Sequence, residues 1–333
     1  MLDTNIDKEL MKDINSATDN KDWLEIPTGP TGVRPSNPVA GQMRFDTTQS
    51  VLEYYNPSIT GWRSVTNAGA DATYVTATGG TVETDGDYKV HIFTSAADFI
   101  VTDNGDANGS NSIQILIVAG GGSGGGGSTA SAINYERGAG GGAGGLRQFA
   151  AFSPAVTTYA IVIGAGASGA SDGNASSGFG YSTTGGGAGG YHGIGSYPAT
   201  VNGRAGGSGG GGATTTSAYA AGEGAKGLGN AGNYTPVEGY DGGESTGYAG
   251  RGGGGGGAGG VGQDDISGSG GGGAGVASSI TGGSVTYASG GDVATAVAGG
   301  ANTGEGGSGN LANTNGYING GSGIVIIRYK FQN

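Results

Sequence analysis

The sequence predicts a mainly β protein. A short N-terminal helix and a β-hairpin module are expected first, followed by a discontinuous, β-sandwich-like domain with glycine-rich polyglycine II bundle insertions. Three observations predict this fold. All but ten of the 82 glycines in the 333-residue chain lie between residues 119 and 323. Apolar segments of strand character, residues 113–119 and 323–331, border that region. Residues 41–65 alternate in polarity around short turns, as in a hairpin.

Composition excludes several classes of protein. Glycine does not recur at every third position and the chain has only 8 prolines, so it is not collagen. The net charge of −12 argues against a nucleic-acid partner. The chain has no cysteine and therefore no disulfides. Residues 1–15 are charged and lack an apolar core, so we expect no signal peptide. No run of ~20 apolar residues predicts a membrane span.

Residues 1–26 are predicted to form an attachment helix. Thr4 is a suitable N-cap, and an apolar stripe at helical spacing follows over residues 4–18, formed by Ile6, Leu10, Met11 and Ile14. A helix of about four turns is marginal by itself. We expect this stripe to dock onto another chain, and the alternative is packing on the hairpin of the same chain.

Residues 27–68 are predicted to form a proline-rich linker and a β-hairpin module. Two short strands are expected around a turn at residues 47–50, and the chain then returns at residues 61–65. Trp62 is expected to cover the apolar positions of the two strands, which are Met43, Phe45, Leu52 and Tyr54. Because an isolated hairpin is barely stable, we expect self-association or a covering neighbour.

Residues 69–118 and 323–333, together with 156–164, are predicted to form one β domain. Residues 88–94 alternate in polarity, and residues 113–119 are almost continuously apolar, as expected of a buried strand. The last apolar segment follows the whole glycine region. It must therefore return to a sheet that begins before that region.

Residues 119–322 are predicted to form a glycine-rich bundle with exposed loops. Ordering a residue's backbone costs roughly 1–2 kcal/mol, and glycine loses the most freedom, so side-chain burial cannot order this region. Backbone hydrogen bonds between polyglycine II helices, which have three residues per turn, can do so because chains without Cβ atoms approach closely. The alternative is disorder.

The segments between the glycine tracts are the candidate binding surface. We expect them to be loops that join one tract to the next, and they are rich in tyrosine, which gives contact area at low entropy cost and a hydroxyl for polar partners such as sugars. The alternative is that the tyrosines only cover the ends of the bundle. The candidate loop residues are Tyr135, Arg137, Tyr191, His192, Tyr197, Tyr219, Tyr234, Tyr240 and Tyr317.

Motifs of catalytic or metal-binding proteins carry no weight in this composition. Matches to GxGxxG and GxSxG occur around Ser123 and Ser208, but a chain that is one quarter glycine produces them by chance. Residues 259–266 match a calcium-binding nonapeptide only once, and that motif works in tandem. The two histidines have no metal-ligand spacing. We therefore expect no enzyme, no cofactor and no metal.

Two parts of the chain resemble phage virion proteins. The run from Pro38 to Asp46, with Leu52 to Asn56 and Gly61-Trp62, is similar to a small hairpin module of phage tail-fibre and related structural proteins. The segments around residues 87–94, 115–122 and 141–147, and the ending GGSGIVIIRY, resemble the glycine-rich domain of many predicted phage tail proteins. The chain is also similar to the polyglycine-sandwich adhesins at long-tail-fibre tips of T-even-like phages. It differs in placing its tracts inside a β domain and in carrying its own N-terminal attachment region.

This resemblance implies a virion fibre or adhesin protein, made in the host cytoplasm without a signal peptide and assembled as a homotrimer. Residues 1–68 are then expected to attach to other virion proteins, and the loops to recognise a host-surface polysaccharide. The alternative is a structural virion component, such as a capsid or neck decoration fibre, without a receptor role.

Overall fold

The computed structural model describes residues 26–57, 61–65, 72–126, 138–191, 201–214, 224–246, 252–265, 270–293, 295–310 and 316–332. The chain divides into two compact units, residues 1–71 and 72–333. The helix expected over residues 4–18, with Ile6, Leu10, Met11 and Ile14, lies outside the described residues. Within them the protein is mainly β, with several antiparallel sheets, one short 3-10 helix at Thr31–Val33 and no α-helix. The described part also has no helix long and apolar enough to cross a membrane.

The N-terminal unit is a four-stranded sheet in the order β1-β2-β3-β4. Its strands are β1 (Thr28–Gly29), β2 (Met43–Asp46), β3 (Val51–Asn56) and β4 (Gly61–Ser64). The first strand pairs in parallel with the second, and the other pairs are antiparallel. The hairpin predicted for residues 41–65 is therefore present, with an added strand from the linker.

The covered face of this hairpin is polar, so the expectation that Trp62 covers the apolar positions is wrong. Trp62 lies opposite Tyr55 and beside Arg44, on the face that buries the charged side chains of the hairpin. Met43 and Phe45 point to the other face and are 43% and 37% exposed. Apolar and polar side chains do alternate along the strands as predicted, but the linker covers the polar face of the hairpin and leaves the apolar face more exposed.

The second unit contains two main sheets. A five-stranded antiparallel sheet has the order β10-β9-β16-β7-β6, with β6 (Thr81–Asp85), β7 (Tyr88–Phe93), β9 (Ile113–Val118), β10 (Leu146–Phe152) and β16 (Ile324–Lys330). A three-stranded sheet has the order β11-β8-β5, with β5 (Val75–Thr78), β8 (Ala97–Asn104) and β11 (Thr158–Ile161). The C-terminal strand lies between β9 and β7, as its apolar sequence predicts.

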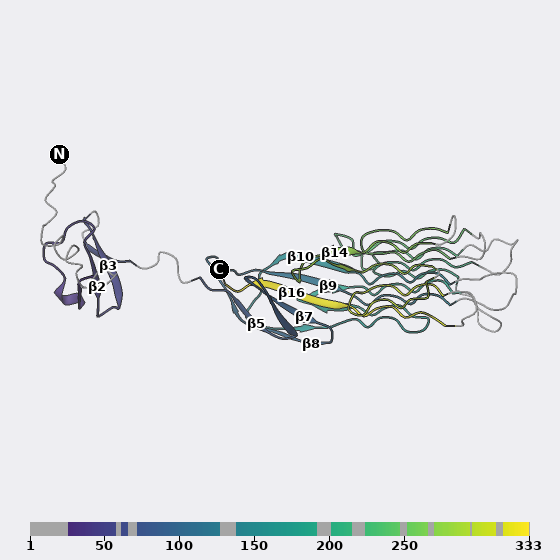
Figure 1. The fold of residues 1–333 in the computed structure, drawn as a ribbon, viewed down its shortest axis with the longest axis horizontal. Coiled ribbons are helices and arrows are strands. Elements are labelled where there is room, and N and C mark those ends of the chain that lie inside the picture. Colours follow the sequence, from purple (N-terminus) through teal and green to yellow (C-terminus); the bar gives the residue numbers. More distant parts are fainter. Residues whose placement is uncertain are drawn as a thin grey trace, which may run out of the picture. The chain divides into compact units, whose positions relative to one another are not determined.

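The central strands of the five-stranded sheet, β9 and β16, are buried on both faces, and Figure 1 shows the three-stranded sheet and the hairpin of β14 (Val276–Ser278) and β15 (Val285–Tyr287) beside this sheet. One face packs against the three-stranded sheet through a core that includes Phe99, Ile115 and Ile327. The other face carries Leu116 and Ile326, which pack under the β14–β15 hairpin. Burial on both faces explains why β9 and β16 are almost continuously apolar.

Five strands lie inside the region that the sequence assigned to the glycine bundle: β10, β14, β15 and the hairpin of β12 (Ser176–Gly178) and β13 (Tyr181–Thr183). Four of them have only three residues each, too few to show a clear alternation. The fifth strand, β10, is identified as a strand by its antiparallel pairing with β9.

The glycine tracts themselves are assigned to neither helix nor strand, so the expected polyglycine II bundles are not seen as regular elements. The described tracts run side by side from the sheets (Figure 1) and are joined by many backbone hydrogen bonds. Their glycines approach very closely: a Cβ atom placed on Gly140 would lie 1.9 Å from the carbonyl oxygen of Gly291, and one on Gly144 would lie 2.0 Å from that of Ala119.

The tract 138–145 shows how these hydrogen bonds are arranged. Its residues are all buried, and every third N–H group points to the same neighbouring segment. With distances of 2.8–3.2 Å, the three sets donate to residues 184–190, 253–256 and 304–310. Its carbonyl groups accept hydrogen bonds from three other places, which are residues 119–125, residues 208–211 and Gly291. One tract is thus bonded to six others, with a period of three residues.

Outer tracts are also bonded by side chains. In five places a carboxylate or amide oxygen accepts a backbone N–H group of a neighbouring tract at 2.7–3.0 Å: Asp172 with Ala188, Asn202 with Ala225, Asp241 with Gly229, Asp264 with Glu244, and Asp292 with Gly272. These contacts satisfy donors that would otherwise have to be solvated.

Candidate functional site

One end of the glycine region gathers residues that are far apart in the sequence. The tract 119–126 leaves β9, and the tract 138–145 returns to β10, so Gly126 and Gly138 lie at the end away from the sheets. We call this the distal end. Described residues at or next to the borders of six ranges contact one another or Val293 there; the ranges are 127–137, 192–200, 215–223, 247–251, 266–269 and 311–315. The contacts are Gly138 with Asn310, Asn310 with Gly316, Tyr191 with Tyr317, Val201 with Ala213, Gly224 with Ser245, Thr246 with Asp265, and Gly270 with Val293.

Tyr191 and Tyr317, two of the predicted site residues, form a pair at this end. Their ring centroids are 5.1 Å apart with a 37° angle between the planes, and both side chains are half-buried. Burial raises the pKa of Tyr317; nearby Tyr191 adds to this rise and Arg204 opposes it. Arg204 also lies 3.6 Å from Asp172, and both of these side chains are about half exposed. The pair thus offers aromatic surface at the distal end, and the ion pair of Arg204 and Asp172 lies next to Ala188, three residues before Tyr191.

Tyr234 and Tyr240 lie in the opposite part of the glycine region, next to the sheets. The ring of Tyr234 packs 4.2 Å from the guanidinium carbon of Arg147, on β10, and its hydroxyl is 2.8 Å from that of Ser182, on β13. Tyr240 is 39% exposed and bonds through its backbone to Gly257. The structure therefore separates these two tyrosines from the distal pair.

The remaining predicted loop residues lie outside the described residues. They are Tyr135, Arg137, His192, Tyr197 and Tyr219. Their role in binding stays a prediction.

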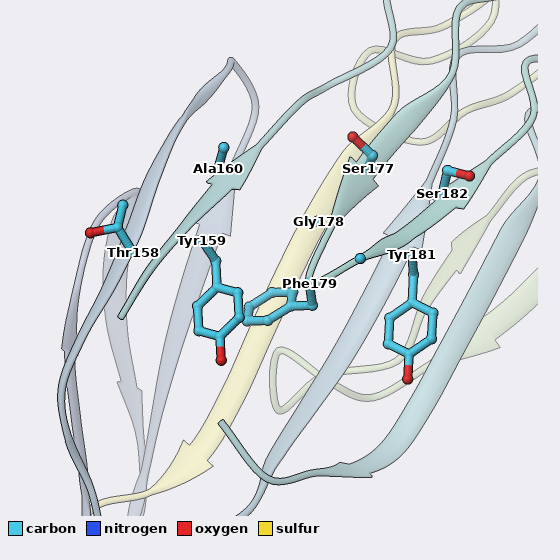
Figure 2. A pocket seen from close by; sticks show the side chains of 9 residues that line it. Thr158, Tyr159, Ala160, Ser177, Gly178, Phe179, Tyr181 and Ser182 are labelled. Carbon is cyan, nitrogen blue, oxygen red and sulfur yellow. The ribbon is translucent and has the colours of Figure 1, made fainter. Parts of the chain in front are cut away.

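A groove beside the β12–β13 hairpin is a second candidate site, which sequence reasoning missed. It has a volume of about 390 Å³ and is lined by Thr158, Tyr159, Ala160, Ser177, Gly178, Phe179, Gly180, Tyr181 and Ser182. Figure 2 shows the ring of Phe179 between Tyr159 and Tyr181, whose hydroxyls point in the same direction. The available sequence signal was the glycine of Phe179-Gly180 between two short polar segments, because glycine is common at the second position of a two-residue hairpin turn, although phenylalanine is not typical of the first.

The rings around this groove form a continuous aromatic cluster. Tyr181 stacks on Phe149 at 4.1 Å, and Phe179 packs against Tyr159 at 4.6 Å and against Phe152 at 5.3 Å. Both tyrosines stay half-buried, and Phe179 is 8% exposed. Phe179 has a φ of 57°, a left-handed conformation that is unusual for a bulky residue, so packing must stabilise this turn.

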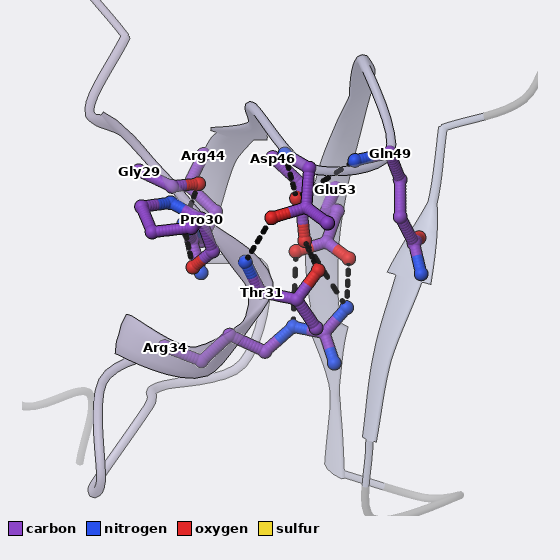
Figure 3. A network of polar contacts seen from close by, with 9 residues as sticks. Gly29, Pro30, Thr31, Arg34, Arg44, Asp46, Gln49 and Glu53 are labelled. Carbon is purple, nitrogen blue, oxygen red and sulfur yellow. Dashed lines mark hydrogen bonds and ion pairs between the residues drawn. The ribbon is translucent and has the colours of Figure 1, made fainter.

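The N-terminal unit has a cluster of charged side chains (Figure 3), which we interpret as structural. Arg34 of the linker forms an ion pair with Glu53 and lies 3.5 Å from Asp46, and Thr31 donates a 2.6 Å hydrogen bond to Asp46. Burial alone would raise the pKa of Asp46, but its hydrogen bonds and the charge of Arg34 lower it. Asp46 and Glu53 are fully buried, so these contacts fasten the linker to the hairpin.

His91 is the one described histidine, and it lies in the core. Its Nδ1 is 2.7 Å from the carbonyl oxygen of Gly79 and its Nε2 is 2.9 Å from the hydroxyl of Tyr329. Burial lowers its pKa, so the neutral ring is favoured. No group of three or more potential metal ligands occurs within the described ranges.

Comparison with known proteins gives a family for most of the second unit. Residues 94–330 match the family of the glycine-rich domain. Searches of curated proteins and of solved structures gave no match.

Proposed function

The chain belongs to the glycine-rich domain family, and we propose that it is a phage virion fibre or adhesin protein. In this proposal residues 1–68 attach to other virion proteins, and the glycine region presents its connecting segments to a host-surface polysaccharide. The observation that carries the proposal is the distal end, where described residues at or next to the borders of six separate ranges contact one another or Val293. An end at which the described residues of many tracts meet is suited to recognition, as in other proteins that carry binding loops on a rigid scaffold.

The scaffold in this proposal is a polyglycine II-type bundle. The support is the three-residue period of the hydrogen bonds of residues 138–145, because a polyglycine II helix has three residues per turn and directs its N–H and C=O groups outward. Six neighbours for one tract fit the same geometry. Such a scaffold depends on the backbone, so the connecting segments are free to differ in sequence.

The proposed ligand class follows from the residues at the distal end. Tyr191 and Tyr317 offer ring surface and hydroxyls at this end, and Arg204 and Asp172, which lie beside Ala188 in the neighbouring part of the tracts, offer charges that are about half exposed. Sugars present C–H groups and many hydroxyls, which match this combination. The recognition step involves no catalysis and no cofactor.

Assembly as a homotrimer is part of the proposal. The described hairpin leaves Met43 and Phe45 partly exposed, and a second copy is a suitable partner for such a surface. The stripe of Ile6, Leu10, Met11 and Ile14 is proposed to contact other virion proteins.

Binding of the purified protein to bacterial cells that the phage infects, and to their extracted surface polysaccharide, tests the receptor role. We expect Tyr317→Ala to reduce binding by about tenfold or more, a value typical of a central aromatic contact. Tyr240→Ala is the matched control, since Tyr240 is also partly exposed but lies next to the sheets. Equal binding by all three proteins, or none at all, would contradict the receptor role. Labelling of virions tests the location, and a head-bound position would favour a decoration fibre.

A further inference from the structure

We propose that the groove beside the β12–β13 hairpin binds a neutral saccharide chain. This site goes beyond the proposed function, because it lies next to the sheets and uses none of the residues at the distal end. Three features support it: a strand edge that faces the groove, hydroxyl groups beside half-buried rings, and the lack of charge in the lining.

The strand edge follows from the register of β11 and β12. Val162 and Ser177 exchange two backbone hydrogen bonds of 2.9 Å each. Alternate residues of a strand direct their N–H and C=O groups to the same side, so Ala160 directs its groups to the same side as Val162. At that level β12 has already turned away at Phe179 and Gly180. Ala160 therefore offers a donor and an acceptor next to each other, which suits hydroxyl groups that both donate and accept.

Hydroxyl groups and rings lie beside this edge (Figure 2). The hydroxyl oxygen of Tyr159 accepts a 2.8 Å hydrogen bond from the N–H group of Ala155, which leaves its own proton to donate. Tyr159 is supported by Phe179, and Tyr181 by Phe149. Each tyrosine thus has one ring face held by a neighbour and part of its surface accessible, the arrangement that packs against the C–H groups of a sugar.

The lining favours an uncharged ligand. None of the nine lining residues is charged. The guanidinium of Arg147 lies beside the lining: its carbon is 5.4 Å from the ring centroid of Tyr181 and 4.2 Å from that of Tyr234, and it donates to the carbonyl oxygen of Ser182 at 3.2 Å. This cation already packs on aromatic rings and donates to a carbonyl oxygen, so a charged ligand would lose its hydration without meeting a counter-charge among the lining residues. The groove is open rather than enclosed, which suits a segment of a longer chain.

Titration calorimetry of the full chain with neutral hexasaccharides of glucose, mannose, galactose and N-acetylglucosamine tests this inference. We expect at least one of them to bind. The test variant is Ala160→Glu, which places an unpaired charge on a residue that lines the groove, and the matched control is Val162→Glu, two residues further along the chain, just after β11 and outside the lining. Both residues are exposed, so both variants should fold.

The expected result is binding that Ala160→Glu weakens by at least about tenfold and that Val162→Glu leaves within about twofold of the original protein. Three results would overturn the proposal: no hexasaccharide binds at millimolar concentration, Ala160→Glu binds as well as the original protein, or both variants lose binding equally. A Thr-Val repeat peptide is titrated in parallel. Binding of this peptide without any saccharide binding would also overturn the proposal, in favour of strand addition.

Discussion

Replacement of Gly141 by alanine tests how closely the glycine tracts pack. An added Cβ atom would lie 2.4 Å from the carbonyl oxygen of Gly122 and 2.6 Å from that of Ser123. Real Cβ atoms essentially never come within 3.0 Å of such an atom, so the two tracts must separate by at least 0.6 Å, the difference between 3.0 and 2.4 Å.

That separation strains three hydrogen bonds at once. The tract 138–145 accepts bonds of 2.8–3.0 Å from Ala119, Gly122 and Gly125, and a shift of this size takes them beyond normal hydrogen-bond length. Each bond contributes about 0.5–1.5 kcal/mol, and overpacking of a core costs about 1–3 kcal/mol. We therefore expect Gly141→Ala to destabilise this part of the protein by about 3–5 kcal/mol.

Hydrogen–deuterium exchange of the amides in residues 138–145 measures the effect locally. A loss of about 3 kcal/mol corresponds to exchange that is faster by about 100-fold. Gly283→Ala is the control, because a Cβ atom there meets nothing within 4 Å and its φ is not left-handed. We expect the control to stay within about 0.5 kcal/mol. Unchanged protection in Gly141→Ala would refute the reasoning, because it would mean that the tracts have free space between them.

Three further predictions concern other contacts. Asp292→Ala should speed exchange of the Gly272 amide by about fivefold, since a hydrogen bond is worth about 1 kcal/mol. Asp292→Asn keeps the acceptor, so its Gly272 amide should exchange nearly as fast as in the original protein, and equal rates in the two variants would refute this. Burial lowers the pKa of His91 in the folded protein. As the pH falls, His91 therefore binds a proton in the unfolded chain before it does so in the folded protein. The free energy of unfolding should therefore be constant above the ordinary pKa of about 6.5 and decrease below it, and His91→Gln should reduce this slope in urea titrations between pH 8 and 5.5. Deletion of residues 324–332 should expose both faces of the five-stranded sheet and cause loss of β structure by circular dichroism, and a folded truncated protein would contradict the position of β16.

The hairpin of the N-terminal unit shows what a local pattern leaves open. Its strands and turn were predictable from the alternation of residues 41–65. The pattern did not reveal which face is covered, because the covering side chain, Arg34, comes from the linker and pairs with charges on the face that looked solvent-exposed. Ion pairing with a distant segment made the polar face the buried one.

In the candidate sites, too, some features were predictable from the sequence and others depend on the fold. The tyrosine-rich segments stood out in the sequence, but only the fold brings Tyr191 and Tyr317 together and places Tyr234 next to Arg147. The groove is built from β11, which lies in the predicted strand segment 156–164, and from the β12–β13 hairpin, whose two strands of three residues each are too short to be recognised before they pair.

The sequence by itself determined that the protein is mainly β and that its C-terminal strand returns to a sheet begun before the glycine region. It also determined that side chains alone cannot order residues 119–323, because these properties depend on composition and local polarity. Only the tertiary structure decided which tracts are neighbours, where their ends meet and where the groove lies. Backbone hydrogen bonds between glycines carry no sequence signal, since every N–H and C=O group is the same, and the partners are chosen by the path of the whole chain.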